Sequence, residues 1–234
     1  MVYSRRRALV ELAAEIESCR ACPRLVAWRE RVAEERRPSF RHEEYWGRPV
    51  SGFGDPEAAI AVVGLAPAAH GANRTGRIFT GDRSGDWLFA SMYRVGLANQ
   101  PDSVSRHDGL ELYGVWVTAS VRCAPPANKP SPAERDRCRP YLERELELVG
   151  PLRVVVVLGQ FAYDVVCRLL GVGPRPRFGH GVTVGAPGGL TIVCSYHPSQ
   201  QNTFTGRLTA PMTDAVLERA ASLAGVRGPA RPGA

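Results

Sequence analysis

Residues 152–159 read LRVVVVLG, and the stretch from Val154 to Leu158 is an unbroken apolar run. Such runs are typical of parallel strands that helices cover on both faces, because neither face then meets water. Three further stretches resemble it in length and composition, namely 58–65 (AAIAVVGL), 113–121 (YGVWVTASV) and 189–196 (GLTIVCSY). We therefore predict four parallel strands in one sheet.

Helical patterns surround these strands. They cover 5–18, 25–37, 83–98, 132–149, 160–171 and 206–224. The helix at 132–149 has a clear start, since Ser131-Pro132-Ala133-Glu134 combines a capping-box pair with proline at the first helical position. The alternation of strands and helices predicts an α/β protein with three layers, α/β/α, around a central four-stranded parallel sheet. We expect one domain over residues 1–224 and a disordered tail over 225–234.

Composition narrows the class of protein. With 234 residues the chain can bury one large core. No stretch reaches the roughly 18 apolar residues of a membrane span, and no signal peptide follows the first arginines. We expect a soluble, cytoplasmic monomer with no membrane partner. The net charge is +7, with Lys129 as the only lysine, which is compatible with a polyanionic partner.

Polar, Gly/Pro-rich loops follow three of the predicted strands. They are 64–70 (GLAPAAH), 122–128 (RCAPPAN) and 197–202 (HPSQQN). Ligands of parallel sheets collect at the carboxyl ends of the strands. The three loops therefore predict one site at a single edge of the sheet.

Four cysteines have the pattern of a metal centre. Cys19 and Cys22 form a C-x-x-C, and Cys123 and Cys138 form a second, wider pair. Four thiolates from two distant segments suit a tetrahedral metal or an iron–sulfur cluster. The pattern lacks the two matched C-x-x-C pairs of a zinc ribbon, so we favour a [4Fe–4S] cluster over zinc and over four unrelated reduced cysteines.

Two long segments carry a family resemblance. Residues 64–82 (GLAPAAHGANRTGRIFTGD) resemble the first motif of the type B, or family 5, uracil-DNA glycosylases, and residues 197–208 (HPSQQNTFTGRL) resemble the second. The four-cysteine pattern is shared with the iron–sulfur enzymes of families 4 and 5. The resemblance spans about residues 10–220 and implies a three-layer α/β/α fold and a bound [4Fe–4S] cluster. It also implies monofunctional excision of uracil and other deaminated bases from damaged double-stranded or single-stranded DNA.

The chain departs from the wider superfamily at two positions. Ala68 stands where several relatives have a water-activating Asp, Asn or Glu, and Ala119 stands where family 4 has an asparagine that reads uracil. Both departures argue against narrow uracil specificity, and both fit family 5.

Excision requires the base to leave the duplex and enter a pocket. We expect Phe79 to stack on the base and the backbone groups of Gly64 and Leu65 to read its edge. Asn128 is a candidate polar contact or, alternatively, a turn former.

Cleavage leaves negative charge on the departing base and positive charge on the sugar. We expect His197 to donate a hydrogen bond to the base. Asp82 either orients water and offsets the sugar cation or caps the following helix. Strand cleavage through a Schiff base needs an amine, and Lys129 offers the only side-chain amine, so excision alone is favoured.

DNA contacts are expected from several arginines and from the loop after His197. Predicted phosphate contacts are Arg74, Arg77 and Arg207, together with Arg83 and Arg122, the alternative for each being a solvated surface charge. Gln200, Gln201 and Asn202 are candidates for entry into the minor groove. The main rival function is a non-catalytic iron–sulfur or zinc nucleic-acid-binding protein, which explains charge and cysteines but gives the strand-end loops no role.

Overall fold

The sheet of this protein has more strands than the sequence predicts. A computed structural model describes residues 2–229, and in this part of the chain one six-stranded sheet has the order β1-β3-β2-β4-β6-β5. The strands are β1 (Phe53–Gly54), β2 (Ile60–Gly64), β3 (Val115–Ala119), β4 (Val154–Leu158), β5 (Thr183–Gly185) and β6 (Thr191–Ser195). The four central strands are parallel, as predicted, while β1 and β5 pair antiparallel at the two edges. The predicted total of four was wrong because the edge strands are too short to show a strand pattern.

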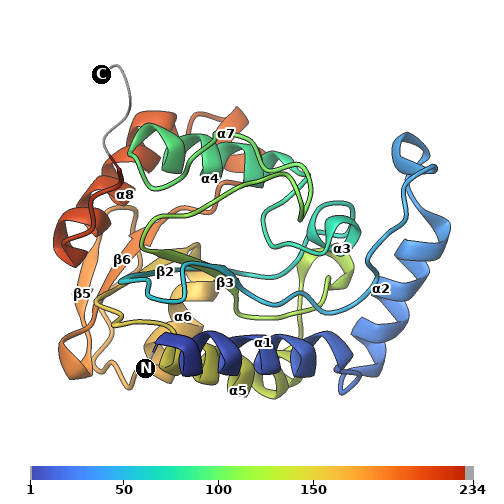
Figure 1. Cartoon of the computed structure of the whole chain (residues 1–234), viewed down its shortest axis with the longest axis horizontal. Coiled ribbons are helices and arrows are strands. Elements are labelled where there is room, and N and C mark those ends of the chain that lie inside the picture. The colour runs from blue at the N-terminus through green and yellow to red at the C-terminus, as the bar shows by residue number, and fades with distance from the viewer. Residues whose placement is uncertain (1, 230–234) are drawn as a thin grey trace.

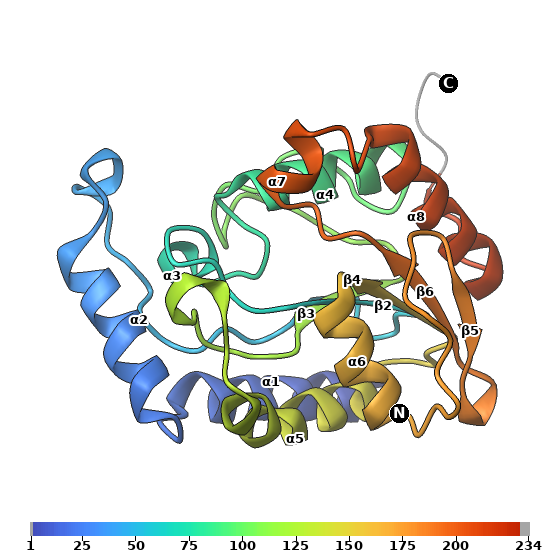
Figure 2. The same ribbon diagram turned by 180° about the vertical axis from the view of Figure 1, so that it is seen from behind.

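Helices cover both faces of this sheet. They are α1 (Val2–Ser18), α2 (Pro23–Glu35), α3 (Ala72–Thr75), α4 (Arg83–Arg94), α5 (Pro132–Leu148), α6 (Gln160–Leu169), α7 (Gln200–Phe204) and α8 (Ala210–Ala224). Figures 1 and 2 show α4, α7 and α8 on one side of the sheet and α1, α5 and α6 on the other. The predicted three-layer α/β/α class is therefore confirmed. The short helices α3 and α7 were missed because neither is long enough to show helical periodicity.

Strand β4 explains why the apolar run was a reliable signal. Val154, Val156 and Leu158 pack into the core beneath α4 and α8, whereas Val155 and Val157 pack into the core beneath α5 and α6. Every residue of the strand is buried, and side chains alternate between the two faces. A strand between two helical layers thus needs an apolar residue at each position.

Helix α5 begins with the predicted capping box. Ser131 Oγ accepts a hydrogen bond from the Glu134 amide, and the Glu134 carboxylate accepts one from the Ser131 amide.

Within residues 2–229 no helix is both long and apolar enough to cross a membrane.

The structure describes only the first residues of the expected tail, 225–229. Val226 packs against the core under α4 and α8 instead of extending into solvent. Residues 230–234 of the predicted disordered tail lie outside the described residues.

Candidate active site

A cavity of about 600 Å³ lies where the loops after β2, β3 and β6 meet. These loops follow the carboxyl ends of parallel strands, which is where such folds bind ligands. The predicted site residues in the cavity wall are Leu65, Phe79, Asp82, Asn128, His197, Gln200 and Gln201. The structure thus brings together the three loops that the sequence placed at one edge of the sheet. The wall also contains Ile78, Ser84 and Ser199, which the sequence did not single out.

The rings of Phe79 and His197 lie next to one another in the wall of this cavity. Their ring centroids are 6.0 Å apart, with an angle of 36° between the ring planes. The backbone of Phe79 is left-handed, with φ of 53°, a conformation that costs a non-glycine residue on the order of 1–3 kcal/mol. The surrounding loop therefore has to hold the ring in place.

Gly64 makes room for the Phe79 ring at the end of β2. A Cβ atom at position 64 would lie only 2.7 Å from Phe79 Cζ, well inside the contact distance of two carbon atoms. The first glycine of the motif is thus required by close packing against the aromatic ring.

His197 is neutral near pH 7. Desolvation by the surrounding protein lowers the pKa of its imidazole to about 4. A neutral imidazole keeps one N–H donor and one acceptor nitrogen. The backbone of His197 is fixed by α7, because Asn202 Nδ2 donates a 2.9 Å hydrogen bond to the His197 carbonyl.

Asp82 caps a helix and also lines the cavity. Its Oδ1 accepts hydrogen bonds from the Ser84 and Gly85 amides, at 2.9 and 3.0 Å, at the start of α4. Desolvation raises the pKa of this carboxyl group, and the two amide hydrogen bonds oppose that rise. The capping alternative is confirmed by this geometry, and Asp82 is also a wall of the cavity.

The backbone carbonyl groups of Gly64 and Leu65 are already engaged. The Gly64 carbonyl accepts from the amide and the hydroxyl of Ser120, at 2.9 and 3.0 Å. The Leu65 carbonyl accepts from the Val121 amide. These carbonyls are therefore poorly placed to read a base, contrary to our expectation. The Leu65 amide, in contrast, has no hydrogen-bond acceptor among residues 2–229, and Leu65 lines the cavity.

Asn128 forms a turn, one of the two alternatives considered for it, and it also lines the cavity. Its backbone is left-handed, with φ of 55°, in the short turn Pro126–Asn128, and the residue lines the cavity. Asparagine tolerates this conformation better than most residues, so its turn-forming role is clear.

Three arginines that we predicted to contact phosphates are buried. Arg74 bonds to Glu43, to the carbonyls of His70 and Gly81, and stacks on a phenylalanine ring. Arg77 pairs with Asp108 at 2.7 Å, and Arg122 with Glu145 at 2.8 Å. Because each is at most 8% exposed, these three predictions were wrong. Their carboxylate partners are distant in sequence, so no local pattern predicts the pairing. These partners are Glu43, Asp108 and Glu145.

Arg83 and Arg207 differ from those three because both are exposed. The Arg83 guanidinium lies 5.1 Å from the centre of the Phe204 ring, and that of Arg207 lies 4.6 Å from the centre of the Tyr196 ring. Phe204 is itself 67% exposed at the end of α7. Arg83, Gln200 and Gln201 lie at the cavity, so cationic, amide and aromatic side chains meet around it.

The four predicted metal-binding cysteines line one small cavity. Cys19, Cys22, Cys123 and Cys138 surround it together with Arg29 and Tyr141, and none of the four is in a disulfide. Arg29 Nη1 donates to Cys123 Sγ at 2.9 Å, and the Arg122 amide donates to Cys138 Sγ at 3.2 Å. No set of three His, Cys, Asp or Glu side chains within residues 2–229 is arranged to hold a single metal ion.

The donors around this small cavity suit an anionic group. The Nε atoms of Arg29 and Arg122 are buried without a hydrogen-bond partner among the described residues. A buried unpaired donor is costly, and a sulfur-rich anionic cluster would offer acceptors. Desolvation raises the pKa of Cys123 to about 11 and that of Cys138 to about 12, so binding as thiolates would release protons.

Fold and cavity define a three-layer α/β/α protein with a ligand site at the carboxyl edge of its parallel strands. The family model of the uracil DNA glycosylase superfamily matches residues 51–221. A type-5 uracil-DNA glycosylase of Mycobacterium bovis is 54% identical over 94% of this chain and 83% of the relative. A type-5 enzyme of Thermus thermophilus is 51% identical over 90% of this chain and 96% of the relative. A type-4 enzyme of Archaeoglobus fulgidus is 32% identical, over 51% of this chain and 53% of the relative.

The chain therefore belongs to the uracil-DNA glycosylase superfamily and groups with its type-5 members.

Proposed function

We propose that this protein removes uracil, and other deaminated bases, from DNA by hydrolysing the N-glycosidic bond in base excision repair. One observation carries the proposal: Phe79 and His197 line the same cavity, at the strand edge where the two motifs meet. Its volume is in the range of small-molecule sites. An extruded base in this cavity stacks on the Phe79 ring and presents its polar edge to donors.

The leaving base takes the electron pair of the broken C1′–N bond. His197 donates an N–H hydrogen bond to a carbonyl oxygen of the base and stabilises the developing negative charge. Because its pKa is about 4, the group acts as a neutral donor at pH 7. We assign the Leu65 amide as a second donor to the base, because it has no acceptor among residues 2–229 and Leu65 lines the cavity.

Water completes the reaction at C1′ of the sugar. Asp82, as a carboxylate, offsets the positive charge on the sugar and orients the incoming water, and the base leaves after taking up a proton. The second carboxylate oxygen lies against Gly71, where a Cβ atom would be 2.0 Å away. Gly71 therefore provides the space in which Asp82 sits beside the cavity.

We infer a broad range of bases from what the cavity lacks. Ala68, in the cavity wall, carries a methyl group and no polar group, and so does Ala119, which is buried at the end of β3. Selection by hydrogen bonding depends on buried polar groups that the wrong ligand leaves unpaired. An apolar side chain at both positions imposes no such penalty.

DNA binding is assigned to the exposed residues Arg83, which lines the cavity, and Arg207. Gln200 and Gln201 are assigned contacts with the duplex around the extruded nucleotide. Asn202 is assigned a different role, since its amide holds the His197 carbonyl. We propose that a monomer acts in the cytoplasm on double-stranded or single-stranded DNA.

Cys19, Cys22, Cys123 and Cys138 are proposed to hold a [4Fe–4S] cluster. When bound, the cluster supplies a structural cross-link and no step of the excision. It would tie the junction of α1 and α2 to the segment after β3. This segment continues to Asn128 in the cavity wall, so the cluster would brace one side of the base site.

The proposal is tested by release of free base from a uracil-containing oligonucleotide. The wild-type protein is expected to release uracil and leave an abasic site, and His197→Ala is expected to bind the duplex but to excise slowly. Binding without release by the wild-type protein would instead support a non-catalytic nucleic-acid-binding protein. A panel of oligonucleotides with hypoxanthine and other deaminated bases then tests the range.

A further inference from the structure

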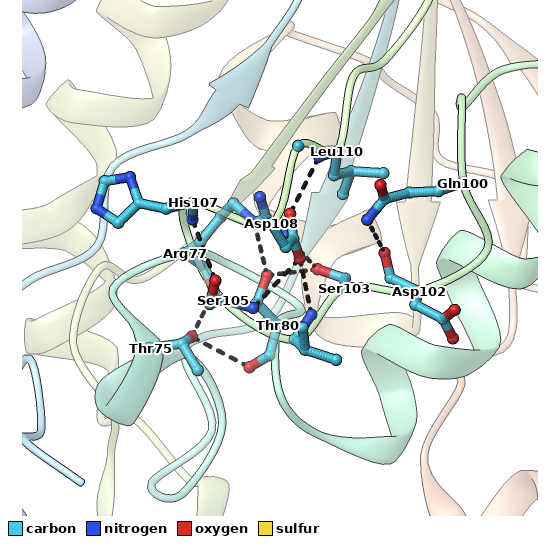
Figure 3. A network of polar contacts seen from close by, with 12 residues as sticks. Thr75, Arg77, Thr80, Gln100, Asp102, Ser103, Ser105, His107, Asp108 and Leu110 are labelled. Atoms are coloured by element: carbon cyan, nitrogen blue, oxygen red, sulfur yellow. Dashed lines mark hydrogen bonds and ion pairs between the residues drawn. The ribbon is translucent and has the colours of Figure 1, made fainter.

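A buried polar network lies next to the cavity but contributes no side chain to its wall. Its centre is the ion pair between Arg77 and Asp108, whose side chains are each 7% exposed. Figure 3 shows how these residues join two loops, 75–80 and 100–110, that are separate in the sequence. The proposed function assigns no role to this network.

Asp108 is the anchor of the second loop. Its Oδ2 accepts hydrogen bonds from Arg77 Nη2 at 2.7 Å and from the amides of Val104 and Ser105 at 2.8 and 3.2 Å. Its Oδ1 accepts from the Leu110 amide at 3.0 Å. The Arg77 guanidinium and three backbone amides together hold the pKa of Asp108 at about 2, against the opposing effect of burial. The carboxylate is thus fully satisfied and fixed.

The same network forms hydrogen bonds with residues on both sides of Phe79. Arg77, two residues before Phe79, donates from Nε to Thr80 Oγ1 at 3.0 Å and from Nη2 to Ser103 Oγ at 2.8 Å. Thr80 and Gly81, which follow Phe79, both bond to Ser103. Thr80 Oγ1 and Ser103 Oγ are 2.7 Å apart, and the Gly81 amide donates to the Ser103 carbonyl at 2.8 Å. The single hydroxyl hydrogen of Thr75 is within hydrogen-bond reach of the carbonyls of Gly71, Arg77 and Thr80, with oxygen–oxygen distances of 3.3, 3.3 and 3.2 Å. The peptide units around Phe79 are therefore held from outside the motif.

Phe79 needs such support because its backbone is left-handed. A phenylalanine adopts this conformation only where its surroundings impose it. Relaxation to an ordinary φ would swing the ring away from Gly64 and His197, which it now contacts.

We propose that Asp108, acting through Arg77 and Ser103, is a positioning residue that holds the Phe79 ring in its base-stacking orientation. Loop 100–110 thereby controls affinity for the extruded base without touching it. This inference rests on the proposed function for its consequence in catalysis, but its structural part, the orientation of the Phe79 ring, can be tested without substrate.

The first test places 4-fluorophenylalanine at position 79 and records the ¹⁹F spectrum of the full-length protein. Asp108→Asn removes the ion pair, and Ser103→Ala removes one hydroxyl while keeping both charges. Asp214→Asn is the matched control, because Asp214 also pairs with an arginine and a serine. Asp214 lies on α8, and its partners Arg94 and Ser91 lie on α4, away from the Phe79 loop. We expect Asp108→Asn and Ser103→Ala to shift the resonance and Asp214→Asn to leave it unchanged. An unchanged resonance in folded Ser103→Ala and Asp108→Asn overturns the inference, whether or not the protein is a glycosylase.

The second test is a double-mutant cycle on single-turnover excision of uracil. Asp108→Asn is expected to lower the rate by about 10- to 100-fold, the range for a displaced binding group. In a Phe79→Ala background the same substitution should have almost no further effect, because the ring it positions is gone. Equal losses in both backgrounds would show a general structural role and overturn the proposal. If Asp108→Asn does not fold, Ser103→Ala replaces it in the cycle with the same two outcomes.

Discussion

Replacing Gly64 with alanine perturbs the Phe79 ring by a distance that the structure defines. A Cβ atom at position 64 would lie 2.7 Å from Phe79 Cζ and 2.8 Å from Phe79 Cε2. Carbon atoms in favourable contact lie about 3.5–4.0 Å apart, so the ring must retreat by roughly 1 Å. The backbone of Gly64 is not left-handed, so the added methyl group acts on the ring and not on the chain conformation.

The expected magnitude follows from this displacement. Overpacking of a well-packed site costs about 1–3 kcal/mol of folding free energy. A misplacement of about 1 Å costs up to about 100-fold in rate. We therefore expect Gly64→Ala to lower single-turnover excision of uracil by about 10- to 100-fold while binding to undamaged duplex is preserved.

Gly185→Ala is the matched control for this experiment. Gly185 ends the edge strand β5, and a Cβ atom there meets nothing within 4 Å, so its activity should equal that of the wild type. Single-turnover kinetics and the thermal midpoint Tm are measured for both variants. A folded Gly64→Ala protein that excises uracil at the wild-type rate would refute the assignment of Phe79 as the stacking face.

Three further predictions concern other parts of the site. The pKa of His197 is about 4 in the folded protein against 6.5 when unfolded, so the neutral form stabilises the fold above pH 6.5. This contribution to the free energy of unfolding should be lost, by about 1.4 kcal/mol per pH unit, as the pH falls from 6.5 to 4. In denaturant titrations His197→Gln should lack that pH dependence. An equal pH dependence in both proteins would contradict a neutral, buried His197. Cys123→Ser should abolish visible absorption from the cluster and lower Tm, whereas stoichiometric zinc in the purified wild-type protein would refute a [4Fe–4S] centre. Arg207→Gln should reduce the salt dependence of duplex binding by about 0.9 in the log–log slope, whereas Arg77→Gln should leave that slope unaltered because Arg77 is buried.

The sequence predicted the layers and the edge of the sheet that carries the cavity because both depend on local signals. Apolar runs such as Val154 to Leu158 need no partner information to be recognised as buried strands. The polar residues that directly follow a strand, such as His197 after β6, are placed at the carboxyl edge by chain connectivity. Phe79, Asp82 and Asn128 reach the same cavity because they lie in the loops after β2 and β3.

The arginines show where local reasoning failed. Arg74 and Arg77 stand in a loop with glycine and threonine, a context in which exposure is the ordinary expectation. Each is buried because a carboxylate far away in the chain, Glu43 or Asp108, reaches it in the fold. Burial of a charge requires such a partner, and the sequence contains many carboxylates without indicating which one pairs.

By itself the sequence determined the α/β/α layering, the parallel core strands and the set of loops that form the cavity, since hydrophobic pattern and strand-end position are properties of short segments. Only the tertiary structure decided which polar groups are free and which are occupied. It showed that the Leu65 amide has no acceptor among the described residues, that the Gly64 carbonyl accepts from Ser120, and that buried Arg77 bonds to Thr80 and Asp108. The physical reason is that hydrogen bonds and ion pairs are satisfied across long sequence separations, and the partner of each group is fixed only when the sheet brings distant loops together.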